Sequence, residues 1–441
     1  MYISYKPLFE LIRARKLKQK DVWKEARLSG SSCQKLRNNE NVTTDILVRL
    51  CEALDCELND IVCVVKENTM TLNTIDLFCG AGGLSLGFKQ AGFNILAGID
   101  NNEPALKTYQ HNMGGALGLS EDLFNAEEAM KDVTKKIGKK RVDVIIAGPP
   151  CQGFSLTGSR DLHDTRNKLY LAVVKAVDFF KPKAFLIENV PGMATLYHGI
   201  VKEQIINTFE DMGYAVSVSP KPLLAADYGV PQMRKRMIFV GFRKDLGYRY
   251  FKFPKPYLTP ENYVTTGEAI SDLPSLKDSL GENITEYTVP AKSNYQKLMR
   301  RNSKYLYNHV GTAHTDKVKW VISQVPEGGN YKDLPQGVGE SRKFHEAWTR
   351  YDSKKPSRTI DTGHRNHFHY KWNRVPTVRE NARLQSFPDN FLFLGTKTQQ
   401  YRQVGNAVPP LLAQALAEKI IKHLEYKDDP LEIDRQTDLG I

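Results

Sequence analysis

Short apolar segments alternate with helical stretches through the middle of the chain, and this alternation constrains the fold more than any other feature. The helical stretches include Leu171–Phe180 and Ile200–Met212. Strands are predicted at Asn73–Phe78, Phe93–Ile99, Val142–Ala147, Ala184–Ile187 and Met237–Gly241. Strands that alternate with helices form a mostly parallel sheet that is covered on both faces. We therefore expect a doubly wound α/β domain that binds ligands at the carboxyl ends of its strands.

Two further regions differ from this pattern. Residues 1–66 have the helical spacing of a small all-α unit, and residues 249–399 are rich in Tyr, Asn, Pro, His and Lys without a clear period. We expect a smaller mixed α/β domain, with a hinge, over 249–399. The alternating domain covers 70–248 and is completed by 400–425, where Pro409–Glu425 has the pattern of an amphipathic helix.

Composition excludes several classes of protein. Of the 441 residues, 41% are hydrophobic and 25% are charged, a balance typical of soluble globular chains. No run approaches the roughly 18 apolar residues that a membrane span requires, and the N-terminal residues lack the apolar core of an export signal. The six cysteines are too few for a disulfide scaffold and lack zinc spacing. We expect a reduced, cytoplasmic protein without a metal site.

The charge is unevenly distributed. The chain carries a formal charge of +12, and residues 243–375 contain 23 Lys and Arg against 14 Asp and Glu. An excess of this kind indicates a polyanionic partner without proving one. The stretch 243–375 is therefore the candidate for nucleic-acid binding.

The N-terminal unit has a helix, a break at Gly30 and a second helix, followed by an amphipathic helix at Asp45–Leu54. It resembles the lambda-repressor-like helix-turn-helix regulators, a resemblance that the run from Glu40 to Ile61 strengthens. The alternative is a helical packing module that binds no DNA, because residues 1–68 carry only two more basic than acidic side chains. The resemblance implies a major-groove face formed by Ser31, Ser32, Gln34, Lys35 and Arg37.

A glycine-rich turn follows the first predicted strand. The sequence DLFCGAGG begins at Asp76, and such a turn lets a ligand lie against backbone N–H groups, although alone it is weak evidence. Asp100 ends the second strand about 20 residues later, where an acid accepts from ribose hydroxyls. Neither GxGxxG nor a P-loop motif is present. The pair therefore favours S-adenosylmethionine, a nucleoside cofactor without phosphates.

Two reactive side chains follow the third and fourth strands. Cys151 comes directly after Pro149 and Pro150, which stiffen the backbone before the thiol, and we interpret it as a nucleophile rather than a buried apolar residue. Glu188 follows three apolar strand residues at the same sheet edge. Partial burial would favour the protonated form that a proton donor requires. The alternative for Glu188 is a helix cap or a surface acid.

Two motifs lie further along the chain. In Gln232–Arg236, alternation places Arg234 and Arg236 on one side, where they can hold an anion or carbonyl oxygens, or form a solvated basic edge. The run QVGNAVPP begins at Gln403 and predicts a turn into the last helix.

Together these blocks resemble the DNA (cytosine-5) methyltransferase family, whose fold is that of S-adenosylmethionine-dependent methyltransferases. The resemblance runs from Thr71 to Leu424 and includes the glycine turn, PPCQGFS, ENV, QxRxR, the block Thr377–Phe391 and QVGNAVPP in order. It implies that Cys151 adds to carbon 6 of cytosine, that Glu188 neutralises N3, and that Arg234 and Arg236 hold the base carbonyl and the active-site loop. S-adenosylmethionine would be held by Phe78, Gly80, Ala81, Gly83, Asp100, Asp122, Leu169 and Asn406. Asn101 departs from the family, because some relatives carry a tryptophan against the adenine there.

The resemblance also implies a flipped-out cytosine in double-stranded DNA. The basic residues of region 249–399 then have a purpose as phosphate contacts, and the candidates are Lys297, Arg300, Arg301 and Lys304. A solvated surface is the alternative. We expect the modification enzyme of a restriction-modification system, with a separately encoded restriction endonuclease and with operator DNA as a second ligand of the N-terminal domain. A tRNA cytosine-5 methyltransferase and a catalytically inactive regulator are the alternatives.

Overall fold

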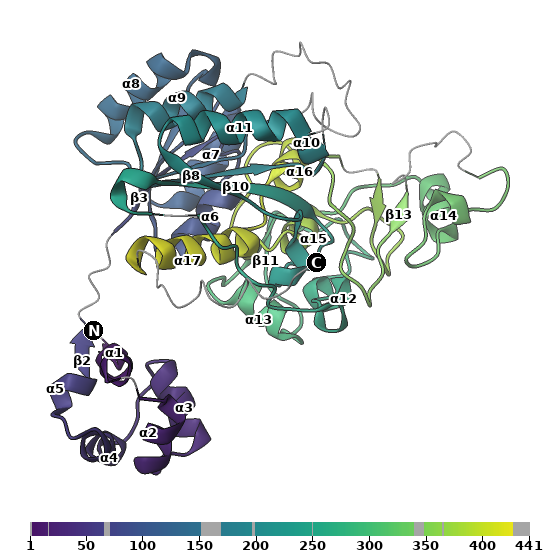
Figure 1. Ribbon diagram of the computed structural model, residues 1–441. Coiled ribbons are helices and arrows are strands. Elements are labelled where there is room, and N and C mark those ends of the chain that lie inside the picture. The colour runs from purple at the N-terminus through teal and green to yellow at the C-terminus, as the bar shows by residue number, and fades with distance from the viewer. Residues whose placement is uncertain are drawn as a thin grey trace. The chain divides into compact units, whose positions relative to one another are not determined.

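The computed structural model describes residues 2–15, 17–65, 71–150, 169–195, 199–248, 250–338, 348–363 and 366–426 (Figure 1). The chain divides into two compact units, Met1–Met70 and Thr71–Ile441. Within the described ranges, no helix has the length and apolar character needed to cross a membrane.

The N-terminal unit is built from five helices and a short antiparallel ribbon. The core is closed by Leu8, Leu36, Leu50 and Ile61, which are all fully buried. Ser29 caps the third helix by accepting from the Ser32 backbone N–H at 3.2 Å. The ribbon was not predicted, because its strands are only three residues long. The elements are α1 (Lys6–Ala14), α2 (Gln19–Glu25), α3 (Gly30–Arg37), α4 (Thr44–Leu54), α5 (Leu58–Ile61), β1 (Tyr2–Ser4) and β2 (Cys63–Val65).

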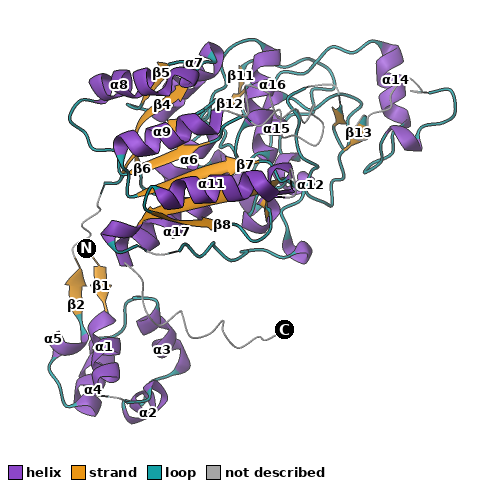
Figure 2. Cartoon of the chain, turned by 45° about the horizontal axis from the view of Figure 1, so that its top comes forward, coloured by secondary structure: helices purple, strands orange, loops and turns teal. Residues whose placement is uncertain are grey.

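The second unit contains the predicted sheet, with strand order β5-β4-β3-β6-β7-β10-β8 (Figure 2). The five strands predicted from the sequence are confirmed as β3, β4, β6, β7 and β10, and β5 was not predicted. β3 (Asn73–Leu77), β4 (Asn94–Asp100), β5 (Leu117–Ser120), β6 (Val144–Ala147) and β7 (Ala184–Asn189) are parallel. β10 (Lys235–Arg243) runs antiparallel to β7, to β8 (Tyr214–Val218) and to β9 (Leu223–Leu224). Successive strands are added to one side of β3 (β4, β5) and then to the other side (β6, β7), so the strand order reverses between β3 and β6, and their carboxyl ends are the expected ligand site.

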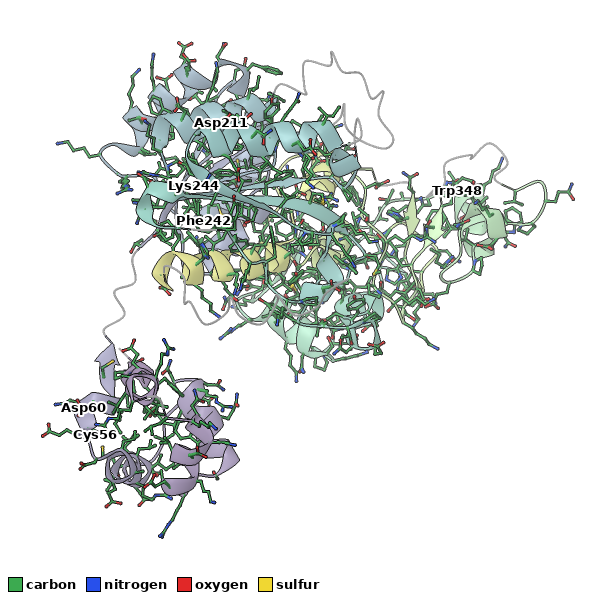
Figure 3. All side chains as sticks on the ribbon, in the orientation of Figure 1. Cys56, Asp60, Asp211, Phe242, Lys244 and Trp348 are labelled. Carbon is green, nitrogen blue, oxygen red and sulfur yellow. The ribbon has the colours of Figure 1, made fainter. Side chains whose placement is uncertain are left out.

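Helices cover both faces of the sheet, as the doubly wound prediction requires. One face packs against α6 (Gly83–Gln90), α7 (Glu103–Met113) and α17 (Pro410–Tyr426). The other face packs against α8 (Ala126–Ile137), α9 (Tyr170–Phe180) and α11 (Ile200–Asp211). At the first face, Phe242, labelled in Figure 3, stacks its ring 4.3 Å from the ring of His423 on α17. The backbone approaches closely at Gly83, where an added Cβ would lie 2.3 Å from the Val408 carbonyl oxygen.

The remaining described residues, from about 250 to 400, form short elements on two small apolar clusters. One cluster centres on Ile270, Tyr295 and Met299, and the other on Ile322 and Phe368. We call residues 249–399 the target region, because the family resemblance predicts a target-recognition domain there. The elements in and beside it are α10 (Gly192–Thr195), α12 (Thr266–Ile270), α13 (Asn294–Arg300), α14 (Asp316–Gln324), α15 (Val378–Leu384), α16 (Lys397–Asn406), β11 (Ile284–Thr285), β12 (Leu306–Tyr307), β13 (Thr349–Arg350) and β14 (His367–Phe368).

Buried ion pairs supplement these small clusters. Arg383 is fully buried and donates to both carboxylate oxygens of Asp389, at 2.8 and 2.6 Å, and to Asp272 at 2.5 Å. Arg374 donates two hydrogen bonds to the Glu380 carboxylate, at 2.8 and 2.7 Å. Bidentate pairs of this kind satisfy charges that would be costly to bury alone.

Candidate functional site

A cavity of about 590 Å³ lies at the carboxyl ends of β3, β4, β6 and β7. Its walls come from segments far apart in the sequence, which include the glycine turn, the end of β7 and α16. It lies where the reversal of strand order predicts a ligand site. The predicted residues that line it are Phe78, Gly80, Ala81, Gly83, Asp100, Asp122, Leu169, Glu188, Arg234, Arg236 and Asn406.

The glycine turn after β3 is joined to the end of β4 by a carboxylate. Asp100 accepts from the Gly80 backbone N–H at 2.8 Å through one oxygen and from the Asn102 N–H at 2.8 Å through the other. Phe78 and Gly80 have positive φ angles of 59° and 53°. A non-glycine residue in this conformation is strained and must be held by its surroundings, which is common at ligand sites.

Asp76 is a cavity residue that sequence reasoning did not assign to the site. Its Oδ2 accepts from the Ser85 hydroxyl at 2.7 Å, whereas Oδ1 has no hydrogen-bond partner among the described residues. Complete burial, opposed by the Ser85 hydrogen bond, raises the pKa of the Asp76 carboxyl to about 7. The available signal was an acid inside an otherwise apolar strand.

Asp122 organises the turn after β5. Its Oδ1 accepts from the Phe124 backbone N–H at 3.0 Å and so caps the short 3₁₀ helix Leu123–Asn125. Leu123 is buried, while Phe124 is exposed and lines the cavity. Leu123 therefore packs this turn against the core, and the Phe124 side chain lies exposed at the cavity.

Glu188 and Arg236 meet in the cavity wall at the end of β7. Glu188 lies opposite Ile238 in the antiparallel pairing of β7 with β10, so Arg236 is its diagonal neighbour. The Arg236 Nε lies 2.5 Å from the Glu188 Oε1, and both side chains are largely buried. The sequence placed both residues at the site but did not pair them, because the antiparallel direction of β10 was not predicted.

Arg234 occupies a different environment from Arg236. It is buried and its Nη2 donates to the Gly405 carbonyl at 3.1 Å, which ties the start of β10 to α16. Burial lowers the pKa of its guanidinium well below the usual value, and Arg236 contributes in the same direction.

Cys151 lies outside the described residues, so its position stays a prediction. Pro149 and Pro150, the two residues before it, line the cavity. The segment Thr359–Thr362 also lines the cavity but was missed, because it carries no motif. It packs so closely on α16 that a Cβ on Gly405 would lie 2.1 Å from the Asp361 carbonyl oxygen.

Most of the side chains predicted to contact DNA are exposed to solvent, whereas Arg300 makes contacts within the protein. On α3, Ser31, Gln34, Lys35 and Arg37 are exposed and Ser32 is half-buried, while Cys33 and Leu36 pack inward. In the target region Lys297, Arg301 and Lys304 are exposed.

Arg300 differs from the other predicted contacts. Its Nη2 lies 2.5 Å from the Asp272 carboxylate, its Nη1 donates to the Val289 carbonyl at 2.8 Å, and its guanidinium stacks 3.9 Å from the Tyr287 ring centre. Its charge is therefore engaged within the protein, and the contact of Arg300 with DNA stays a prediction.

Comparisons with known proteins agree with the geometry. A family model described as C-5 cytosine-specific DNA methylase matches residues 72–422, and a Cro/C1-type HTH DNA-binding domain matches residues 8–67. The type II methyltransferase M.DdeI of Desulfomicrobium norvegicum is 39% identical over 378 residues, which cover 80% of this chain and 89% of that protein. The type II methyltransferase M1.HphI of Haemophilus parahaemolyticus is 41% identical, covering 80% and 87%.

A solved structure is also similar. A prophage-encoded DNA modification methyltransferase from E. coli has a TM-score of 0.67 and 29% identity, and the match covers 80% of this chain and 99% of that one. The match of the methylase model to most of the chain shows the family and supports DNA over tRNA as the substrate. The chain is therefore a member of the C-5 cytosine-specific DNA methylase family, a DNA cytosine-5 methyltransferase of the type II kind that also carries a Cro/C1-type helix-turn-helix domain.

Proposed function

We propose that this protein binds S-adenosylmethionine and methylates carbon 5 of a cytosine that has been flipped out of double-stranded DNA, through a covalent adduct with Cys151. The observation that carries the proposal is a single cavity lined both by the glycine turn with Asp100 and by the Glu188–Arg236 pair. A cofactor and a base that occupied its two ends would lie within reach of each other.

The residues present fit S-adenosylmethionine. The cavity volume of about 590 Å³ is within the range of small-molecule sites. Besides Glu188 and Asp361, the described carboxylates that line it are Asp76, Asp100, Glu121 and Asp122, and Asp76 has one oxygen without a partner among the described residues. This acidic lining suits a cofactor that carries an ammonium and a sulfonium but no phosphate. When bound, S-adenosylmethionine supplies an electrophilic methyl group.

The side chains of this protein would activate the cytosine for that group. The Cys151 thiolate adds to carbon 6, while Glu188 neutralises the charge that develops toward N3, and carbon 5 becomes nucleophilic. Arg236 lies 2.5 Å from the Glu188 carboxylate and would hold it in place while orienting the base carbonyl. After methylation, loss of the carbon 5 proton and elimination of Cys151 restore the aromatic ring and the thiol. No step requires a metal.

The covalent step is tested with a duplex whose target cytosine carries fluorine at carbon 5, since the missing proton blocks elimination. We expect a stable adduct that peptide mass spectrometry places on Cys151, and no adduct with Cys151→Ala. Among the described residues, the thiol that lines the cavity is Cys79, and burial raises the pKa of that thiol well above the usual value. An adduct on Cys79, or methylation by Cys151→Ala at the normal rate, would contradict the nucleophile assignment.

We also propose that the N-terminal domain binds operator DNA and regulates transcription of the modification system, whose endonuclease is encoded separately. The supporting observation is the α3 face, on which polar and basic side chains are exposed while Cys33 and Leu36 are buried. Lys35→Ala with Arg37→Ala should abolish the mobility shift of the upstream DNA and leave methylation unchanged.

Arg13→Ala, an exposed change on α1, is the matched control for that experiment. Equal shifts by both variants would favour a packing module that binds no DNA. Cys151→Ala with normal promoter binding separates this activity from methylation, and normal methylation by wild type excludes an inactive regulator.

A further inference from the structure

Phe124 is a large apolar side chain that the protein leaves outside its core. It is 52% exposed, whereas Leu123, Leu169 and Ile360, which line the same cavity, are each below 9%. None of the apolar clusters formed by the described residues includes it. Exposed apolar area at the wall of a cavity indicates contact with a ligand.

The backbone of Phe124 is rigidly held. Asp122 accepts from its N–H, Leu123 is buried directly before it, and the buried Ala126 begins α8 directly after the turn. The Asp122 carboxylate and the Phe124 ring therefore reach the cavity from one fixed turn. A side chain mounted in this way loses little further freedom when a ligand binds.

Where the end of β4 lines the cavity, the described residues supply no aromatic ring. Asp100 and Asn101 line it at the end of β4, and Asn101 stands where some family members carry tryptophan. The aromatic side chains among the described lining residues are Phe78 and Phe124. Phe78 packs partly against the core beneath the sheet. Phe124 is thus the ring available where Asp100, Asn101 and Asp122 come together.

We propose that Phe124 forms the aromatic wall against the adenine of bound S-adenosylmethionine. In this protein the ring is supplied by the turn after β5 instead of the end of β4, and it shares that turn with Asp122. The inference rests on the proposed function, because it assumes that the cavity takes this nucleoside cofactor.

Alanine substitution of an aromatic side chain that stacks on a base weakens binding by about 5- to 150-fold. We therefore measure binding by isothermal titration calorimetry to the full chain, with S-adenosylhomocysteine and with 5′-methylthioadenosine as probes. Phe124→Ala should weaken both probes by the same factor, since both contain adenine and only one contains the amino acid. Phe124→Trp should restore binding, and Phe124→Leu should give an intermediate value.

Phe179→Ala is the matched control, because Phe179 is 44% exposed on α9 and does not line the cavity. It should bind both probes like wild type. Under saturating cofactor, Phe124→Ala should keep its kcat and show only a higher KM for S-adenosylmethionine.

Three outcomes would overturn the inference while wild type still binds S-adenosylhomocysteine. These are unchanged affinity in Phe124→Ala, a loss restricted to S-adenosylhomocysteine, and full rescue by Phe124→Leu. If wild type binds neither probe, the cofactor assignment itself fails, and the two failures are therefore distinguishable.

Discussion

The sheet region and the target region both bury carboxylates, but they hold them in opposite ways. Asp76 in β3 has no cationic partner among the described residues, and burial raises its pKa to about 7. Glu380 in α15 is equally buried, but the two hydrogen bonds from Arg374 hold its pKa well below the usual value despite desolvation. The target region satisfies its own charges, whereas the sheet region leaves one for a ligand. Unsatisfied burial therefore marks the functional site, and satisfied burial marks structure.

The largest effect is expected in the sheet region, at Glu188 near the end of β7. Glu188→Gln should lower the rate of methylation by about 10²- to 10⁴-fold, because a neutral amide cannot deliver a proton to N3 of the base. Binding of S-adenosylhomocysteine, measured by calorimetry, should stay within about 3-fold of wild type, since no folding role is assigned to the carboxylate. Glu203→Gln, an exposed change on α11, is the control. A mutant that keeps its rate would remove Glu188 from the mechanism.

The target region is tested by breaking its ion pairs. Arg383→Met should destabilise it by about 3–5 kcal/mol, because it leaves Asp389 buried without its bidentate guanidinium and leaves Asp272 paired with Arg300 alone. Hydrogen exchange of residues 250–338 and 366–399 should accelerate, whereas β3 and β6 should keep their protection. Lys135→Met breaks an exposed pair with Asp132 and should change nothing measurable. Equal exchange in both variants would show that the pairs are incidental.

The two buried carboxylates predict opposite dependence of stability on pH. The folded-state pKa of Asp76 is raised. Its contribution to the free energy of unfolding is therefore full below about pH 4 and is lost as the pH rises through about 7. The folded-state pKa of Glu380 is depressed, so its contribution is present above about pH 4.5 and is lost only in strong acid.

Between pH 5 and 7, the wild type should lose up to about 1.4 kcal/mol of unfolding free energy per pH unit through Asp76, and Asp76→Asn should abolish this loss. The free energies are measured by urea unfolding of the cofactor-free chain. Glu380→Gln should lower stability across this range and leave the slope as in wild type. A slope unchanged by Asp76→Asn would mean that the folded-state pKa of Asp76 is not raised above that of the unfolded chain.

The smallest effect is expected from the exposed lysines and arginines of the target region. If Lys297, Arg301 and Lys304 contact phosphates, each change to Ala should reduce the slope of log affinity against log salt by about 0.9. Arg300→Ala should leave the salt slope unchanged and destabilise the target region, because its guanidinium pairs with Asp272. Filter binding of duplex DNA at several salt concentrations measures the slopes. A uniform loss of slope at all four positions would contradict the distinction.

Local pattern predicted the sheet region better than the target region, for a physical reason. The strands β6, β7 and β10 were expected because each carries four consecutive apolar residues, as burial on both faces requires, and β3 and β4 were expected as short apolar segments, the first ending in a glycine turn and the second at Asp100. β5 was missed because its sequence is LGLS, which is short and contains glycine. In the target region the strands are two residues long, so no period could reveal them.

The sequence by itself determined the class of fold, the family and the residues that end the strands, because strand ends and motifs are local properties of the chain. Only the tertiary structure decided which of these residues meet. The antiparallel direction of β10 brings Arg236 to Glu188, α16 brings the Gly405 carbonyl to Arg234, and Asp272 engages Arg300. These contacts join segments 28 to 171 positions apart, and such partners depend on packing, register and burial rather than on neighbouring sequence.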